Sequence, residues 1–298
     1  MNTIENFLQE LLNSQNLTPD QERTLQAHKA EVTTFLQAEF GSDPIIRYAG
    51  SHEKGTMIRD NYDLDIICYF PSSDSRTLKE IREDVSDHLS KNYVIEPRAS
   101  AERIKNLKGA TAPEGYHIDV VPGRVIPGTK DVFIHVAYGD RERMQTNLKT
   151  HIDHIVNSGC VPVIRLVKIW AHRNNIHIKT FILELFVVEA LSGSRNKSNL
   201  QESFLKVMET FKDKFDNLQL VDPANTNNIV SQTIDASEKM TVMSTAEDTF
   251  TSIDGSDDLS NWKAIFGETG GGNHTVRPTP TPPSSSSAGF TPHAPWSI

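Results

Sequence analysis

The sequence predicts an α/β (α+β) fold: a half that mixes strands and helices, followed by a half built of helices alone. The first observation is that apolar spacing alternates between strand-like and helical up to about residue 138. The second is that the spacing is helical in nearly every segment from 141 to 266. The third is that Gly, Pro, Ser and Thr dominate from residue 268, a composition that cannot offset the entropy of an ordered chain. The predicted domains are therefore 1–140, 141–267 and a disordered Pro/Ser/Gly-rich tail at 268–298.

Each element follows from its own pattern. Apolar residues three and four apart predict the helices, as in Ile4, Phe7 and Leu11, and Gly41 is a plausible stop for the second helix. Short apolar runs between turn residues predict the strands. In the first half we expect helices at 4–13, 20–40 and 76–90, and strands at 45–49, 63–70, 93–96, 100–107, 116–121 and 132–136. In the second half we expect helices at 141–157, 161–174, 180–191, 198–216, 229–250 and 258–266.

Composition excludes several classes of protein. The 298 residues, 37% of them hydrophobic, suffice for one sizeable core or two modest ones. The sequence contains no run of 18 apolar residues, so we expect no membrane span. The first residues carry Glu5 and Glu10 where a secretory signal would carry positive charge. The two cysteines, Cys68 and Cys160, lie in apolar stretches, which predicts buried, reduced thiols in a cytoplasmic protein rather than disulfides or a zinc site.

Charge is unevenly distributed along the chain. The formal net charge is −9, which disfavours broad binding to a nucleic-acid backbone. Residues 101–200 nevertheless hold 14 Lys/Arg against 9 Asp/Glu, whereas residues 201–298 hold 6 against 13. A basic zone within an acidic protein favours a small polyanionic ligand over a long nucleic acid.

Three carboxylates form the candidate chemical centre. Asp63 and Asp65 are two apart in a predicted strand, so their side chains share one face. Two bare carboxylates repel each other, and a divalent cation such as Mg²⁺ relieves the conflict. Asp119, set among apolar residues in another predicted strand, is a third ligand that would allow two metals to act together.

A Gly-Ser turn precedes the carboxylates. Gly50 lets backbone N–H groups approach an anion, and a helix that begins near Ser51 would direct its positive end at a triphosphate. Each motif alone is weak, since an isolated D-x-D is usually a solvated strand or turn. Together they indicate transfer of a nucleotidyl group from a nucleoside triphosphate.

The combined pattern resembles the DNA polymerase β-like nucleotidyltransferase superfamily and, within it, the bacterial cGAS/DncV-like nucleotidyltransferases (CD-NTases). The resemblance covers about residues 20–267. It implies a catalytic nucleotidyltransferase sheet followed by an oligoadenylate-synthetase-like helical domain. Tyr62 departs from the pattern, because a small residue is common before the first aspartate. The matching segments are 50–56, 63–65, 118–122, 163–170, 179–184, 221–229 and 261–267.

The resemblance implies roles at the matching positions. Asp63, Asp65 and Asp119 would bind Mg²⁺ (Mn²⁺ is an alternative), with Asp119 helping to activate the attacking hydroxyl. The remaining matches would bind the substrate: Gly50, Ser51 and Lys168 at the triphosphate and Thr180 near the nucleotide. The implied products are cyclic oligonucleotides made from ATP and/or GTP as second messengers in CBASS anti-phage defence.

Other interpretations remain open from the sequence. A template-independent RNA nucleotidyltransferase, of the CCA- or poly(A)-adding type, is the alternative enzyme, although it would require a sustained basic surface. A nucleotide sensor without activity is the non-enzymatic alternative. Lys168 could also be the polar member of an amphipathic helix, Arg165 could contact phosphate, and Glu184 is better explained by a buried ion pair than by catalysis. The tail could bind a regulatory protein through Phe290 and Trp296, or it could only aid solubility.

Overall fold

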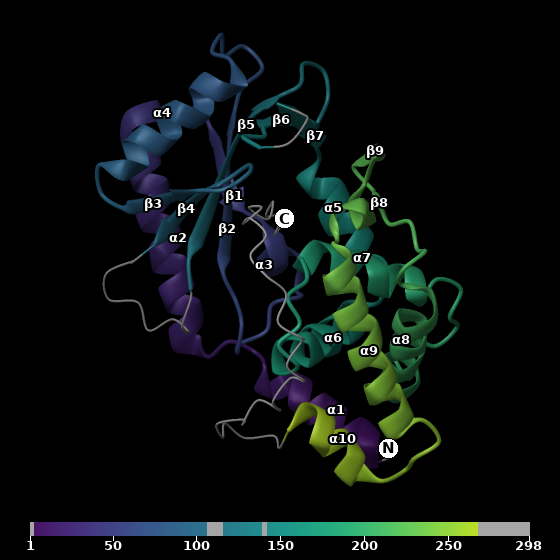
Figure 1. Cartoon of the computed structure of the whole chain (residues 1–298). Helices are drawn as coiled ribbons and strands as arrows, with labels where there is room; N and C mark the ends of the chain where they lie inside the picture. Colours follow the sequence, from purple (N-terminus) through teal and green to yellow (C-terminus); the bar gives the residue numbers. More distant parts are fainter. Residues whose placement is uncertain (1–2, 106–115, 139–141, 268–298) are drawn as a thin grey trace, which may run out of the picture.

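The computed structural model describes residues 3–105, 116–138 and 142–267, so the tail and its predicted partner-binding residues lie outside the described part. The first half begins with two helices and a seven-stranded sheet with two further helices (Figure 1). Its elements are α1 (Thr3–Ser14), α2 (Pro19–Phe40), β1 (Ile45–Tyr48), α3 (Gly50–Lys54), β2 (Leu64–Phe70), α4 (Leu78–Ser90), β3 (Val94–Pro97), β4 (Glu102–Lys105), β5 (Ile118–Val125), β6 (Val132–His135) and β7 (Arg143–Thr146).

The sheet has the strand order β1-β2-β5-β4-β3, and β6 and β7 continue from β5. Strands β2 and β5 run parallel, and the other pairs are antiparallel. All seven residues of β2 are buried, as expected of a central strand covered on both faces. The parallel pair matters most, because it brings together two segments that lie about fifty residues apart in the chain.

Alternation along the strands separates the two faces of the sheet. Even-numbered residues such as Leu64, Ile66 and Ile118 pack against α2 and α4 in one apolar cluster. The odd-numbered residues of β2 and β5 lie on the opposite face, which turns toward the helical half of the molecule (Figure 1). A polar residue at an odd position is therefore placed between the two halves.

The second half is helical apart from a small hairpin. It contains α5 (Leu148–Val156), α6 (Val161–Arg173), α7 (Thr180–Ala190), α8 (Leu200–Lys214), β8 (Val221–Asp222), β9 (Asn225–Ile229), the 3-10 turn η1 (Val230–Thr233), α9 (Ala236–Ile253) and α10 (Leu259–Phe266). The core includes stacked aromatic rings, with Phe186 and Phe211 centroids 3.8 Å apart. Trp170 belongs to this core and donates its indole N–H to the Thr249 hydroxyl.

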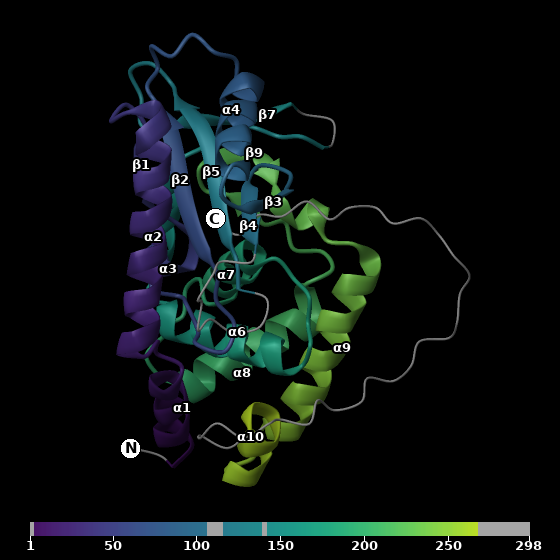
Figure 2. The same cartoon turned by 90° about the vertical axis from the view of Figure 1, so that its left-hand side faces the viewer.

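Helix α1 packs with the helical half, although it comes first in the chain. Its apolar face, which includes Leu8 and Leu11, is fully buried in the same cluster as α6, α7 and α8. Figure 2 shows α1 beside α10, away from the sheet. The domain boundary at residue 140 stays a prediction, and the core of the helical half includes a segment from well before it.

Two predicted helices were wrong in part. The segment 141–157 contains strand β7 before α5, because Arg143–Thr146 pairs with β6 at the edge of the sheet. The segment 229–250 begins in β9 and η1, and α9 starts only at Ala236, where Asp235 forms a capping box with Glu238. In these two places pairing with the preceding strand and a helix cap, respectively, override the local apolar spacing.

Two further predictions concern the cysteines and membrane-spanning helices. Cys68 and Cys160 are both buried free thiols, which confirms that prediction. Among the residues the structure describes, none of the helices combines the length and the apolar character needed to cross a bilayer.

Candidate active site

Asp65 and Asp119 are directly opposite each other on the parallel strands β2 and β5. Both occupy odd positions, so both lie on the face between the two halves of the molecule. Asp63 immediately precedes β2 and is paired with His117, whose Nε2 lies 3.3 Å from Asp63 Oδ2 and 3.6 Å from Asp119 Oδ2. The sheet thus gathers the three aspartates in one region.

The Gly-Ser turn lies against Asp65. The Ala49 N–H donates to the Asp65 carbonyl at 2.9 Å, which extends the pairing of β1 with β2 into the turn. Gly50 has φ +60°, and a Cβ atom at this position would stand 1.6 Å from Asp65 Oδ2. Glycine is required here for both reasons: the backbone is left-handed and the carboxylate fills the space. Ser51 follows in the first turn of α3 and is buried.

A small pocket of about 40 Å³ collects most of the predicted substrate and metal residues. Its lining comes from α3, the segment before β2, β2 itself, α6 and α7, so it lies where the two halves meet. Gly50 and Asp119 adjoin Asp65, which lines it. The lining residues are Ser51, Lys54, Asn61, Tyr62, Asp63, Asp65, Lys168 and Thr180.

The carboxylates experience strong and opposite electrostatic effects. Burial raises the pKa of Asp65 well above its ordinary value, and the negative charges of Asp63 and Asp119 raise it further. Burial alone would also raise the pKa of Asp63, but the hydrogen bond and charge of His117 outweigh it and lower that pKa. Asp65 Oδ1 is buried without a hydrogen-bond partner. A buried carboxylate with a free oxygen beside two like charges is the environment that a divalent cation stabilises.

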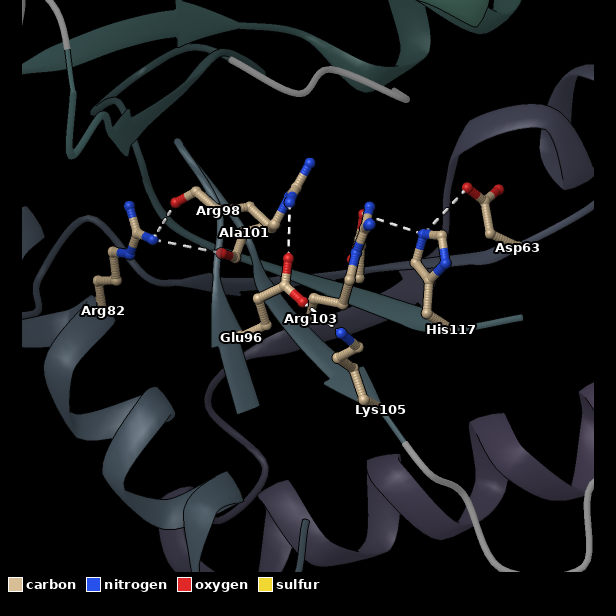
Figure 3. A network of polar contacts seen from close by, with 9 residues as sticks. Asp63, Arg82, Glu96, Arg98, Ala101, Arg103, Lys105 and His117 are labelled. Carbon is tan, nitrogen blue, oxygen red and sulfur yellow. Dashed lines mark hydrogen bonds and ion pairs between the residues drawn. The ribbon is translucent and has the colours of Figure 1, made fainter. Parts of the chain in front are cut away.

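Asp119 is held from its other side by Arg103. The Arg103 Nε and Nη2 donate to the two carboxylate oxygens of Asp119, each at 2.8 Å. The register continues across the sheet, so that Asp65, Asp119, Arg103 and Glu96 form one row on β2, β5, β4 and β3. Figure 3 shows Arg103 within this network and His117 directed at Asp63. The row thus places one cation, Arg103, between the acidic pair and the further carboxylate of Glu96.

The donor chemistry fits a hard divalent cation, although the side chains are not gathered around one point. In the ranges 3–105, 116–138 and 142–267, no three His, Cys, Asp or Glu side chains converge as a bound metal requires. Arg103 and His117 draw Asp119 and Asp63 toward themselves. Each carboxylate oxygen has two lone pairs, so these contacts leave acceptor sites free. The aspartate triad as metal ligands therefore stays a prediction.

The cations of the pocket come from both halves. Lys54 Nζ lies 2.5 Å from Glu184 Oε2, and the Thr56 hydroxyl donates to Glu184 Oε1 at 2.5 Å. Glu184 thus makes the buried ion pair favoured from the sequence. Burial lowers the pKa of Lys168, while the charge of Glu184 acts in the opposite direction and Lys54 lowers it further. Lys168 lines the pocket rather than a solvated helix face.

Sequence reasoning missed several residues of the site. His117 and Arg103 contact the aspartates, but neither belongs to a motif, and Arg103 acquires its position only through the β4–β5 register. The alternation of β5 could have indicated His117, which is two residues before Asp119. Arg165 does not reach the pocket. It donates hydrogen bonds to the carbonyls of Met57 and Leu12, each at 3.1 Å, and so links α6 to the end of α1 and to the segment before β2.

Comparison with known proteins identifies the fold. No family model matches the chain. A cyclic AMP-AMP-AMP synthase from Escherichia coli (strain MS 115-1) is 26% identical over 263 residues, which cover 74% of this chain and 81% of the relative. The Bradyrhizobium diazoefficiens CD-NTase CdnG, solved with GTP, has a TM-score of 0.71 and 13% identity, covering 89% of this chain and 96% of its own. The chain has the CD-NTase fold.

A second CD-NTase structure, that of E. coli MS115-1 CdnC in complex with a HORMA-deltaN protein, has a TM-score of 0.69 and 21% identity. It covers 90% of this chain and 98% of the CdnC chain. The family resemblance and the predicted fold class, a nucleotidyltransferase sheet followed by helices, are thereby confirmed. The near-complete coverage shows that the CD-NTase fold extends over both halves of this chain.

Proposed function

We propose that this chain is a nucleotidyltransferase that joins ATP and/or GTP into a cyclic oligonucleotide second messenger. One observation carries the proposal: Asp65 stands beside Asp119 on parallel strands, within a site that also contains the Gly50–Ser51 turn, Lys168 and Thr180. Nucleotidyl transfer needs this combination of acidic groups for metal and of N–H and cationic groups for phosphate. The similarity to a cyclic AMP-AMP-AMP synthase supports a cyclic product.

The residues divide the work of transfer between them. The Gly50 backbone and the Ser51 hydroxyl would bind the outer phosphates, where Gly50 allows the closest approach of the main chain. Lys168 would neutralise phosphate charge from the helical half. Asp119, oriented by both donors of Arg103, would accept the proton of the attacking hydroxyl.

Divalent metal belongs to the same proposal. Asp63, Asp65 and Asp119 would hold Mg²⁺, with Mn²⁺ as the alternative, because their oxygens are hard donors and Asp65 Oδ1 has no partner. Two such ions supply charge neutralisation at the transferred phosphate and at the attacking and leaving oxygens. The protein contributes the alignment of the aspartates through the β2–β5 register.

An RNA-extending activity is not favoured. The relative that matches in sequence is a cyclic oligonucleotide synthase, and residues 201–298 are acidic, with 13 Asp/Glu against 6 Lys/Arg. An enzyme that elongates RNA needs a sustained positive surface along the backbone. Extension of labelled RNA by the purified protein would support this alternative instead.

We place this activity in cytoplasmic CBASS anti-phage signalling under the control of a partner protein. Two buried free thiols suit a reducing compartment. The complex of E. coli CdnC with a HORMA-deltaN protein supports a regulatory protein as partner, and the tail at 268–298 is the segment we propose to bind it.

Product analysis tests the proposed function. The protein is incubated with labelled ATP and GTP, singly and together, in Mg²⁺, and the products are treated with phosphatase and identified by mass spectrometry. We expect phosphatase-resistant cyclic products that disappear in Asp63→Ala and Asp65→Ala variants and persist in Asp43→Ala, a control at an exposed aspartate. No resistant product, with and without a HORMA-type partner, would refute the proposal.

A further inference from the structure

The segment of residues 56–60 joins two parts of the active site and lies between the two halves of the molecule. It connects α3, which carries the Gly-Ser turn, to the residues at 61–63 that line the active-site pocket before β2 begins. The Met57 side chain packs against the apolar cluster of the sheet, whereas Ile58 is 1% exposed within the cluster of the helical half. The contacts that fix this segment therefore also fix one wall of the pocket.

Gln15, directly after α1, holds the end of the segment with three hydrogen bonds. Its side chain donates from Nε2 to Asp60 Oδ2 at 2.7 Å and accepts at Oε1 from the Asp60 N–H at 3.1 Å. Its carbonyl accepts from the Arg59 N–H at 3.0 Å. The orientation of the amide is settled, because a backbone N–H can only donate. Gln15 is 2% exposed, so water hardly competes for these bonds.

Two helices of the second half hold the start of the segment. Arg165 of α6 donates from Nε to the Met57 carbonyl. The Thr56 hydroxyl donates to the buried carboxylate of Glu184 on α7. The segment belongs to the first half in sequence, yet it is attached to α6, to α7 and to the end of α1, all of which pack in the helical core.

Asp63 lies in a short stretch between two fixed points of the chain. Asp60 is fixed by Gln15, and Leu64 is fixed by its N–H, which donates at 3.1 Å to the carbonyl directly before β5. Only residues 61–63 separate the two points, and three residues span about 10 Å at most. A displacement of Asp60 is therefore passed on to Asp63 and is not absorbed by slack in the chain.

We propose that Gln15 is a positioning residue, which fixes Asp63 at the metal site through its bonds to the 56–60 segment. The inference rests on the proposed function, in which Asp63 helps to hold the metal. Gln15 does not line the pocket, so it acts on the site through the chain and not by contact with metal or nucleotide. Partners that orient a metal ligand from outside its first shell raise metal affinity or activity by about tenfold to a hundredfold.

Three substitutions isolate the bonds of Gln15. Gln15→Met keeps the length of the side chain and removes its donor and its acceptor. Gln15→Glu places a second carboxylate against Asp60 Oδ2, and Asp60→Asn in the same chain restores a donor that faces it. Gln9→Ala, at an exposed glutamine of α1, is the matched control.

Two measurements follow the site at a temperature where circular dichroism shows every variant folded. Mn²⁺ titration by electron paramagnetic resonance gives the metal affinity, counted as the binding that Asp65→Asn removes, and labelled ATP gives kcat and KM. We expect Gln15→Met to weaken this Mn²⁺ binding by about tenfold and to lower kcat by about tenfold to a hundredfold. KM for ATP should change less, because the phosphate-binding turn and lysine lie outside the segment.

The remaining variants separate positioning from mere stabilisation. Gln15→Glu should lose at least as much as Gln15→Met, the double variant with Asp60→Asn should recover most of the loss, and Gln9→Ala should match the wild type. A folded Gln15→Met with wild-type Mn²⁺ affinity and kcat would overturn the proposal, even if it melts at a lower temperature. Should Gln15→Met not fold, Gln15→Asn, which keeps the amide but is one methylene shorter, decides by the same two measurements.

The metal measurement keeps this inference separate from the proposed function. Mn²⁺ binding that needs both Asp65 and Gln15, without any oligonucleotide product, would uphold the positioning role and refute the synthase. Cyclic products formed with a kcat and a metal affinity that do not depend on Gln15 would do the reverse. A wild-type chain with neither product nor Asp65-dependent Mn²⁺ binding would overturn both.

Discussion

At the scale of single residues, the Gly50 backbone lies so close to the Asp65 carboxylate that no side chain fits between them. Position 50 combines a left-handed φ of +60° with space for no more than a hydrogen atom. Gly41 has a similar φ of +67°, but nothing lies within 4 Å of a Cβ placed there. Substitutions at these two glycines therefore distinguish the effect of backbone strain from that of steric collision.

We expect Gly50→Ala to abolish nucleotidyl transfer and Gly41→Ala to leave it intact. Both variants should lose about 1–2 kcal/mol to backbone strain, and Gly50→Ala should lose more because Asp65 must move. Urea unfolding monitored by circular dichroism and product formation measure the two effects. Equal behaviour of the two variants would contradict the role assigned to the turn.

We expect the Asp65 carboxylate to lower the stability of the fold while being required for activity. Its pKa is raised in the folded protein, so its ionisation destabilises the fold as pH rises above the unfolded-state value. In EDTA at pH 7.5, Asp65→Asn should therefore melt at or above the wild-type temperature, by about 2–4 °C for each kcal/mol gained. Mg²⁺ should raise the melting temperature of the wild type and not of the variant. A variant that melts lower in EDTA would contradict the charge repulsion inferred here.

Many residues of this site could be predicted from the sequence, but Arg103 could not. Spacing two apart predicted that Asp63 and Asp65 share one face of a strand, although β2 begins only at Leu64, and apolar flanks indicated Asp119 in a strand. Arg103 could not be predicted, because only the antiparallel register of β4 with β5 places it opposite Asp119. Cross-strand partners depend on the whole sheet and not on local pattern.

At the scale of elements, a buried ion pair connects the two halves of the molecule. Lys54, at the end of α3, pairs with Glu184 of α7, and their side chains are 2% and 0% exposed. Burial alone would raise the pKa of Glu184, but the charges of Lys54 and Lys168 outweigh it and lower that pKa. The pair holds α3, which carries the Gly-Ser turn, against α7, which carries Thr180.

Lys54→Met should destabilise the protein by about 3–5 kcal/mol, because it leaves a buried carboxylate with one partner fewer. The double variant Lys54→Met/Glu184→Gln should recover much of that loss. Lys149→Met, which breaks an exposed pair with Asp153, should change stability by about 0.5 kcal/mol or less. Urea unfolding at pH 7 makes the three comparisons, and a double variant as weak as the single one would contradict the explanation.

The same pair gives a pH dependence with a definite sign. The pKa of Glu184 is lower in the folded than in the unfolded chain, so its stabilisation is present above the unfolded value and is lost as pH falls through the folded value. The stability difference between wild type and Lys54→Met/Glu184→Gln should therefore shrink below pH of about 4. A difference that grows on acidification would contradict this assignment.

Element prediction failed where short strands of weak pattern pair with the strand next to them in the chain. The four residues of β7 have no strong strand pattern and become a strand because β6 offers a free edge. The β8–β9 hairpin occupies the connection between the predicted helices 198–216 and 229–250 and shortens the second of them at its start. The long amphipathic helices, by contrast, were predicted to within a few residues at their ends.

At the scale of the whole molecule, α1 makes the helical half depend on the amino-terminal segment. Its buried face contributes Ile4, Phe7, Leu8, Leu11 and Leu12, each at most 5% exposed. Glu5 also accepts hydrogen bonds from the N–H groups of Leu200 and Gln201 at the start of α8. A cut at residue 140 would therefore expose this surface on the carboxy-terminal fragment.

We expect a fragment of residues 142–267 to lack cooperative thermal unfolding on its own and to gain it when a peptide of residues 3–16 is added. A peptide with Leu8 and Leu11 replaced by aspartate is the control and should have no effect. Circular dichroism melts with and without peptide measure the difference. A fragment that melts cooperatively alone would show that α1 is dispensable for this core.

The position of α1 also affects how the protein is made. During synthesis α1 leaves the ribosome first, whereas its partners follow much later: α6 ends at Arg173, α8 at Lys214 and α10 at Phe266. Until then its apolar face has no native surface to cover it, and exposed faces of this kind attract chaperones and aggregate. Chains that stop before these helices are made would therefore keep the apolar face of α1 exposed and remain substrates for quality control, even though all strands of the sheet are already present at Thr146.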